Sequence, residues 1–328
     1  MFDFRRKKPE KVAVNKISKP QYINALKINQ LNMIKRINKY NNVNNVNNEN
    51  NVNNVNNVNN ENVILNIINE LALTNPPEYI DAYEIQNIVN YIYDKYNEKI
   101  VNSYNPDINN KKFLFLIAAH TNNEFKLQNV KTLINYISFD CIEIMVLNTE
   151  LLTYSNDLKE FCKEKNVFYS ERENYITCDS GKWVELLSQK QNSFYDYVFF
   201  ANDSFIIEDS INHFINLTVK KNVELFAYND SSEEKYHYQS YLFSIRSDAV
   251  NKYIDMFNLY KNKIFCFQDL IKNYELNMIE KFSSHDCFLK IKDIPCNTGL
   301  NIFFYDDYLY QILKNTGVLP FVKLKRII

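Results

Sequence analysis

From residue 112 onward, segments typical of β-strands alternate with segments typical of α-helices. Apolar runs rich in β-branched and aromatic residues predict the strands, and amphipathic stretches predict the helices. The predicted strands are 113–119, 142–147, 167–169, the run from 195 into 202–204, 223–228 and 238–246, and the predicted helices are 127–137, 157–165, 182–189, 210–220, 248–261, 268–281 and 307–315. This alternation implies an α/β fold with a mostly parallel sheet flanked by helices.

Two parts of different composition stand at the start of the chain. Residues 1–40 hold eleven Lys and Arg against two acidic residues, which predicts a basic arm, and 23–37 has the pattern of an amphipathic helix. Residues 41–62 repeat Asn-Asn-Val or Asn-Asn-Glu every three residues. That period fits neither a helix nor a strand. A tract this rich in Asn buries too little apolar surface to fold by itself, so we predict a disordered linker.

A short helical region precedes the main domain. Residues 63–73 and 78–104 each have a helical pattern, and adjacent prolines between them force a break. We therefore predict a helical lead-in over 63–111 and one α/β domain over 112–328.

Composition bounds the class of protein. The net charge of -1 argues against a globally basic nucleic-acid binder, so nucleic acid is not an expected partner. The six cysteines form no CxxC pair and no zinc spacing with the four histidines, as in reduced thiols of a cytosolic chain. The chain starts without a signal-peptide pattern, and its longest apolar run is too short to cross a bilayer. We expect a cytoplasmic protein without a transmembrane segment.

The strand-forming run from Tyr195 ends abruptly in three small polar residues, Asn202, Asp203 and Ser204. In open α/β sheets, ligands bind outside the carboxyl ends of the strands. Asp203, expected to face solvent there, offers a carboxylate oxygen, and its two neighbours offer neutral oxygens. Such a set suits Mn²⁺ or Mg²⁺ carrying a diphosphate. The alternative is a simple Asx turn, since these are also the commonest turn residues.

A second segment, 172–183, holds one of the three glycines and the only tryptophan. Gly181, placed before a predicted helix, would let backbone N–H groups approach a ligand, and Asp179 can accept hydrogen bonds from a ribose or a base. The alternative interpretation is a capped helix start with a core tryptophan.

Five segments, taken in order, resemble the rhamnan synthesis F family of polysaccharide glycosyltransferases. Residues 172–183 are similar to its Asn-x-Gly-x-Asp-Phe-Gly-x-Trp stretch, 202–204 to its Asn-Asp-Ser, and 237–242 to its His-x-Gln-Ser-Tyr-Phe. Residues 274–275 match a Tyr-Glu pair, and 317–323 is close to its terminal Gly-x-Pro-Phe-x-Lys. The resemblance runs from about residue 112 to the end, roughly two thirds of the chain.

The chain departs from the family's pattern at three places. Ser180 replaces an aromatic residue, Tyr175 replaces a glycine, and one extra residue separates Gly317 from Pro320. These departures bear on the donor sugar more than on the fold.

The resemblance implies a GT-A fold and the transfer of a sugar, in that family often L-rhamnose, from a dTDP- or UDP-sugar donor to a glycan acceptor. The metal would be held by Asn202, Asp203 and Ser204. The donor-binding residues that it implies are His120, Thr121, Asn174, Asp179, Gly181, Lys182, Asn202, Asp203 and Lys323. The acceptor side would be lined by His237, Gln239 and Ser240, with Glu275 as the catalytic base of an inverting transfer and Asp286 as the reserve candidate.

Two other classes of function stay open. A GT-A scaffold can serve as a non-catalytic binder of nucleotide sugars or glycans, and the single carboxylate of 202–204 is compatible with that. Alternatively the basic arm is the functional part and binds nucleic acid, in which case binding would depend steeply on salt and vanish without residues 1–40.

The linker gives the first testable prediction. Protease should cleave within 41–62 long before it cleaves the core, and leave a stable fragment that begins between about residues 63 and 112, because cleavage concentrates where backbone is exposed. Limited proteolysis followed by mass spectrometry measures this, and a repeat that survives as long as the core contradicts the boundary.

Overall fold

The computed structural model describes residues 65–74, 76–77, 80–103, 110–137, 141–173, 177–190, 194–294 and 307–323, apart from the side chains of residues 267 and 307. The chain divides into 1–60 and 61–328, and all described residues belong to the second unit. The predicted basic arm and Asn-rich linker therefore lie outside the described residues, and their boundaries stay predictions.

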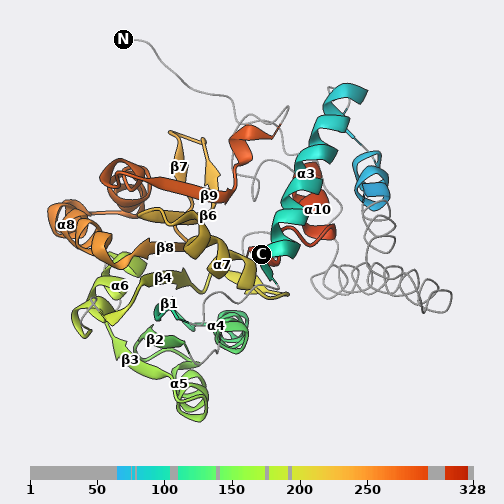
Figure 1. Ribbon diagram of the computed structural model, residues 1–328. Helices are drawn as coiled ribbons and strands as arrows, with labels where there is room; N and C mark the ends of the chain where they lie inside the picture. Colours follow the sequence, from blue (N-terminus) through green and yellow to red (C-terminus); the bar gives the residue numbers. More distant parts are fainter. Residues whose placement is uncertain are drawn as a thin grey trace, which may run out of the picture. The chain divides into compact units, whose positions relative to one another are not determined.

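An eight-stranded sheet forms the centre of the described region (Figure 1). Its strands are β1 (Phe113–Ala119), β2 (Ile142–Thr149), β3 (Phe168–Arg172), β4 (Tyr197–Asn202), β6 (Leu225–Ser231), β7 (His237–Tyr238), β8 (Leu242–Arg246) and β9 (His285–Leu289). The order is β3-β2-β1-β4-β8-β6-β7, and β9 also pairs with β6. The first four strands run parallel, β8 is antiparallel to both of its neighbours, and β9 is parallel to β6.

Helices cover both faces of this sheet. They are α4 (Glu124–Ile137), α5 (Ser155–Glu164), α6 (Cys178–Ser188), α7 (Asn212–Lys221), α8 (Val250–Tyr260) and α9 (Phe267–Leu270). Figure 1 shows α6 and α8 on one side of the sheet and α4 and α7 on the other. Every residue of β1 is buried, as expected for a strand that is covered on both faces. The predicted fold class, an α/β fold with a mostly parallel sheet flanked by helices, is confirmed.

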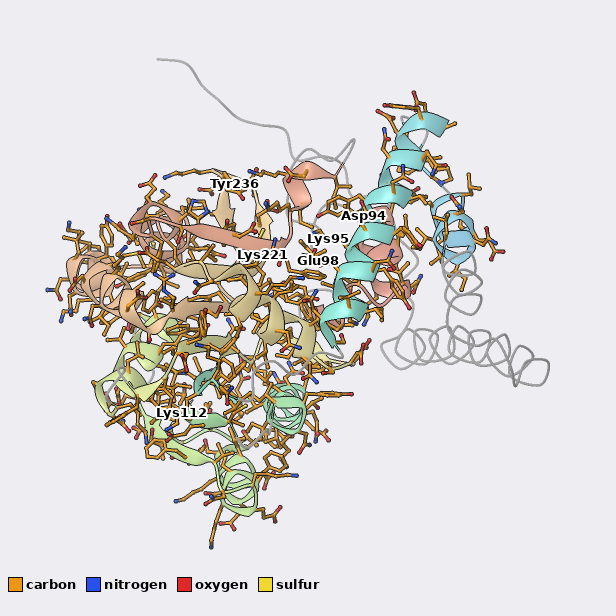
Figure 2. The ribbon with its side chains drawn as sticks, in the orientation of Figure 1. Asp94, Lys95, Glu98, Lys112, Lys221 and Tyr236 are labelled. Atoms are coloured by element: carbon orange, nitrogen blue, oxygen red, sulfur yellow. The ribbon has the colours of Figure 1, made fainter. Side chains whose placement is uncertain are left out.

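The helical lead-in packs beside the domain. Residues 65–72 are helical, and the longer α3 (Ala82–Ser103) contacts α7. Buried Lys99 of α3 donates to the carboxylate of Asp209 at 2.8 Å and to the carbonyl of Gly317 at 2.6 Å, so it fastens α3 to two distant segments. Lys221, at the end of α7, lies near Glu98 of α3 (Figure 2). Within the described residues, no helix combines the length and the apolarity that crossing a membrane requires.

Several predicted elements were wrong in detail. The strand expected over 238–246 is split, because regular strand structure is interrupted at 239–241, between β7 and β8. The helix expected over 268–281 is α9 followed by a π-helical segment, Ile271–Glu275, and a 3₁₀ turn, Ile279–Lys281.

Three strands were not predicted at all. β9 begins with polar residues, and β5 (Phe205–Ile207) and β10 (Phe321–Lys323) form an antiparallel pair of segments more than one hundred residues apart in the chain. The helix α10 (Asp307–Asn315), by contrast, has the predicted bounds.

Trp183 locks α6 onto the sheet. Its ring meets Phe200 and Phe243 edge-on at 5.8 and 5.5 Å between centroids, and its indole N–H donates to the carbonyl of Ala201 at 3.1 Å. Aromatic pairs of this geometry add about 0.5–1.5 kcal/mol each beyond the apolar area that they bury. The first turn of α6 is thereby held against the carboxyl end of β4.

Candidate functional site at the carboxyl ends of the strands

Polar side chains gather where the parallel strands end. His120 and Thr121 follow β1, Asn202 ends β4, and Asp203 and Ser204 follow it. Because β8 is antiparallel to both β4 and β6, β6 runs in the same direction as β4 and ends at the same edge. Ligand sites of open α/β sheets lie at this edge, so the expected location of the site is supported by the strand directions.

Asp203 is not the solvent-facing residue that we expected. It is 6% exposed, its Oδ2 accepts the backbone N–H of His120 at 2.5 Å, and its Oδ1 lies 3.4 Å from the ammonium of Lys126. The side-chain amide of Asn129 donates to its backbone carbonyl at 2.8 Å. The carboxylate therefore ties the end of β4 to the end of β1.

A continuous chain of hydrogen bonds runs through four of the predicted residues. Asn202 donates its amide to the carboxylate of Asp179 at 2.9 Å, and its carbonyl oxygen accepts the hydroxyl of Ser204 at 2.6 Å. The ammonium of Lys323 donates to the same hydroxyl at 2.7 Å and lies 3.7 Å from the centroid of the Tyr241 ring. The fold thus brings together side chains from α6, β4 and β10.

Lys182 is buried at the centre of this region. Its ammonium donates to the carbonyl of Ala119 at 2.5 Å and to the hydroxyl of Thr149 at 2.8 Å. Nδ1 of His120 contacts the same hydroxyl at 2.9 Å. Burial lowers the pKa of Lys182, although the nearby carboxylates of Asp179 and Asp203 oppose the shift.

The pKa values of two other groups in the region, Asp179 and His120, are shifted by the same surroundings. Burial raises the pKa of Asp179, and the neighbouring negative charge of Asp203 adds to the rise, while Lys182 opposes it. Burial lowers the pKa of His120, and the positive charges of Lys126 and Lys182 add to the fall. The site is therefore a closely coupled set of carboxylates and ammonium groups.

Gly181 has a different role from the one expected. It stands inside α6, because the helix starts at Cys178, and its N–H bonds to the carbonyl of Thr177 at 3.3 Å. A Cβ atom at this position would lie 2.2 Å from the hydroxyl oxygen of Thr177. The glycine is thus required by close packing in the first turn rather than by a free amide. Asn174 lies outside the described residues.

Mn²⁺ and Mg²⁺ each need several oxygen ligands. Both carboxylate oxygens of Asp203 already face donors, and the hydroxyl of Ser204 is engaged by Asn202 and Lys323. Among the residues that the structure describes, no group of three His, Cys, Asp or Glu side chains is placed to hold a metal ion. In this arrangement the side chains do not fit a divalent ion held by the protein, and the metal stays an untested prediction.

The predicted acceptor residues and the predicted base come together in a second cluster. Glu275 ends the π-helical segment, and its Oε1 accepts the backbone N–H of Ser240 at 3.2 Å. Nε2 of His237 lies 3.9 Å from the same oxygen, and the amide of Gln239 lies 3.3 Å from that nitrogen. π-Helical turns occur disproportionately at functional sites.

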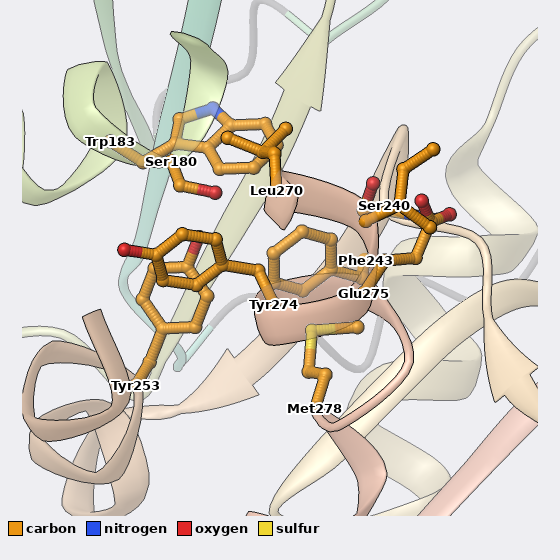
Figure 3. Close-up of a pocket in the computed structure, with 10 residues that line it drawn as sticks. Ser180, Trp183, Ser240, Phe243, Tyr253, Leu270, Tyr274, Glu275 and Met278 are labelled. Atoms are coloured by element: carbon orange, nitrogen blue, oxygen red, sulfur yellow. The ribbon is translucent and has the colours of Figure 1, made fainter. Parts of the chain in front are cut away.

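One small pocket borders the second cluster (Figure 3). Ser180 and Trp183 of α6 line one side of it, and Ser240 and Glu275 line another. Figure 3 shows the carboxylate of Glu275 close to Ser240. Ser180 follows Asp179 in α6, so the pocket that Glu275 lines lies beside the turn that carries Asp179, although Asp179 itself does not line it.

Asp286, the reserve candidate, belongs elsewhere. Its carboxylate pairs with Lys290 at 2.9 Å and with Lys221 at 3.3 Å, and Lys221 also lies 4.0 Å from Glu98 of α3. Partial burial alone would raise its pKa, but the bonds from Lys290 and from the backbone N–H of Cys287 outweigh burial and lower it. A carboxylate so paired is a weak base and a structural ion-pair partner.

Sequence reasoning missed Asp230. It is fully buried at the end of β6, its Oδ1 accepts the backbone N–H of Ile291 at 2.5 Å, and burial raises the pKa of Asp230 to about 6. A signal was present, because 229–231 repeats the Asn-Asp-Ser of 202–204. Both copies end strands at the same sheet edge, and Asp230 fixes the turn that follows β9.

Asp230 makes the stability of the fold depend on pH. Its pKa is higher in the folded chain than in the unfolded one, so its contribution is largest at low pH and is lost as the pH rises through about 6. Between about pH 5 and pH 7 the wild type should lose about 1 kcal/mol more stability than Asp230→Asn. Urea denaturation at both pH values measures this, and parallel losses in the two proteins contradict it.

No family model matches the chain. Two curated sequences, both named virulence protein VirA and both from Vibrio anguillarum, one of them strain 775, are 32% identical over 158 residues. The match covers 44% of this chain, and the chain spans about half (47%) of the length of these relatives.

Similar solved structures are named as sugar transferases. The glycosyltransferase GlyE of Streptococcus pneumoniae gives a TM-score of 0.40 at 12% identity, over 66% of this chain and 55% of GlyE. A mannosyltransferase of Pyrobaculum calidifontis, in complex with GDP-Man and Mn²⁺, gives 0.35 at 8%, over 56% and 58%. A putative nucleotide-diphospho-sugar transferase of Desulfovibrio desulfuricans gives 0.36 at 9%, over 63% and 96%. At such low scores, the function must be argued from the residues of this chain.

Proposed function

We propose that this chain is a glycosyltransferase of the GT-A type, which moves a sugar from a nucleotide-sugar donor to a hydroxyl group of a glycan. The observation that carries the proposal is the shared pocket of Figure 3. Glu275, a carboxylate held by a backbone N–H, faces the same space as the turn of α6 that carries Asp179. A base and a donor-binding edge on one pocket are what sugar transfer requires.

The nucleotide would lie along the carboxyl ends of β1 and β4. His120 and Thr121 would border the base and ribose, and Asp179 would accept hydrogen bonds from the ribose hydroxyls. The diphosphate would then approach Ser204 and Lys323, which are joined by a hydrogen bond. The donor sugar would extend from there into the pocket beside Glu275.

The transfer is a single displacement at the anomeric carbon. A bond forms between the acceptor oxygen and that carbon, while the bond from the carbon to the phosphate oxygen breaks and its electron pair leaves with the diphosphate. The proton of the acceptor hydroxyl passes to Glu275 as the carbon becomes oxocarbenium-like. Attack from the face opposite the leaving group inverts the anomeric configuration.

The residues around Glu275 would orient both the base and the acceptor. The N–H of Ser240 fixes one carboxylate oxygen, and the imidazole of His237 stands next to that same oxygen. Gln239 contacts the imidazole and lies in the segment 239–241, between β7 and β8. A dTDP-L-rhamnose or UDP-sugar donor, a polysaccharide acceptor and a cytoplasmic location remain proposals from the resemblance.

One observation favours a second function. The carboxylate of Asp203 is turned toward His120 and Lys126, which leaves neutral Asn202 and Ser204 beside Asp179 and Lys323. Such an edge suits a protein that binds a nucleotide sugar without turning it over. Turnover of nucleotide sugars, measured by release of the nucleoside diphosphate, separates the two functions.

Glu275→Gln tests the catalytic role. The amide keeps the shape and the reach of the side chain but removes its basicity, so transfer should fall by about two to four orders of magnitude. Donor binding, measured by calorimetry, should survive. The assay compares release of nucleoside diphosphate with an acceptor glycan for wild type and variant across a panel of nucleotide sugars.

Two further variants serve as controls. Glu280→Gln alters an exposed glutamate that pairs with Lys235, and Asp286→Asn alters the ion-paired reserve candidate, so both should retain nearly wild-type transfer. If Asp286→Asn is inactive while Glu275→Gln is active, the two roles must be exchanged. If both remain active, the inverting mechanism through a carboxylate base has to be abandoned.

A further inference from the structure

The segment 202–204 presents no negative charge toward Lys323. Asn202 and Ser204 bond to each other and lie on the side of Asp179 and Lys323, while Asp203 between them turns toward His120 and Lys126. The backbone N–H of Ser204 also donates to the side-chain oxygen of Asn202 at 3.1 Å, so β4 ends in the Asx turn that was the alternative interpretation of this segment. The place where metal ligands were expected is therefore occupied by two neutral side chains.

Lys323 brings a positive charge to the same place. Its ammonium bonds to the hydroxyl of Ser204 at 2.7 Å and lies over the ring of Tyr241. The backbone around it is fixed, because Lys323 pairs with Phe205 in the short sheet of β5 and β10. Strand register thus places the backbone of Lys323 opposite Phe205, and the bond to Ser204 orients its side chain.

The charges near Lys323 favour the binding of an anion over the binding of a metal cation. Three ammonium groups, of Lys126, Lys182 and Lys323, accompany the two carboxylates of Asp179 and Asp203. A divalent ion would meet these ammonium groups, and the oxygens that it needs already accept hydrogen bonds. A diphosphate would instead meet hydrogen-bond donors of opposite charge, since ammonium groups bind phosphate as point charges.

We propose that this chain holds the diphosphate of its donor with ammonium groups, Lys323 foremost, and requires no divalent metal ion. The inference rests on the proposed function. When the anomeric bond breaks, its electron pair passes to the diphosphate oxygen, and Lys323 offsets the negative charge that develops there. Lys126 pairs with the carboxylate of Asp203 and offsets its charge.

Binding of UDP and dTDP, measured by calorimetry in EDTA and again with Mn²⁺, tests the proposal. Binding in EDTA should equal binding with Mn²⁺ to within about twofold. Lys323→Met should weaken binding at least about tenfold in EDTA, as loss of a charge-assisted hydrogen bond implies, whereas Lys323→Arg should retain most of it. Lys261→Met, which alters an exposed lysine bonded to Asn258, is the matched control and should bind as the wild type does.

The outcomes are distinguishable. Binding that disappears in EDTA and returns with Mn²⁺ overturns the inference and leaves the proposed function standing. Wild-type affinity in Lys323→Met overturns the role of this lysine, and thermal melting of Lys323→Met and Lys323→Arg separates lost contacts from lost folding. If neither UDP nor dTDP binds under either condition, the proposed function itself fails.

Discussion

The hydrogen bond from the backbone N–H of His120 to the carboxylate of Asp203 joins the two strands on which the site depends. β1 and β4 are adjacent and parallel, yet their ladder ends at Asn202, and only this side-chain bond continues the connection beyond it. A buried hydrogen bond to a charged group contributes about 1.5–3 kcal/mol. Through it, the segment that carries Asn202 and Ser204 keeps a fixed direction over the sheet edge.

The arrangement around this bond separates two tasks that one acidic motif was expected to perform. Asp203 serves the architecture, while Asp179, Asn202, Ser204 and Lys323 form the hydrogen-bonded chain at which we propose that the diphosphate binds. Trp183 supports the same division, because its bond to Ala201 fixes α6 at the level of Asn202. In the proposed reaction, these side chains would already be in place before the donor binds, as preorganised stabilisation of a transition state requires.

Much of the fold could be predicted from the sequence where local pattern and tertiary environment agree. β1 has the predicted bounds because a strand buried on both faces is apolar throughout, and that signal needs no partner. β9 was not predicted, because its polar first residues adopt a strand through pairing with β6. β5 and β10 were not predicted, because the strand propensity of three residues does not identify a pairing partner far along the chain.

The sequence predicted that several of the candidate residues lie together, but not how their side chains are oriented, and their roles stay a proposal. Glu275, His237 and Ser240 meet as the resemblance implied. The inward turn of Asp203 depends on the N–H of His120, which no local pattern near residue 203 records. Asp230 went unnoticed because its importance comes from burial, and burial at a strand end is decided by the segment that folds over it.

The π-helical turn that ends at Glu275 has an evolutionary consequence. A π-turn is an α-helix that has accommodated an extra residue, and each residue of an α-helix advances the side chains by about 100°. Deleting one residue from 271–275 would turn the residues on its two sides by about 100° relative to each other, and so would move the carboxylate of Glu275 relative to the pocket. A lineage could therefore lose or regain the position of this carboxylate through a single-codon deletion or insertion.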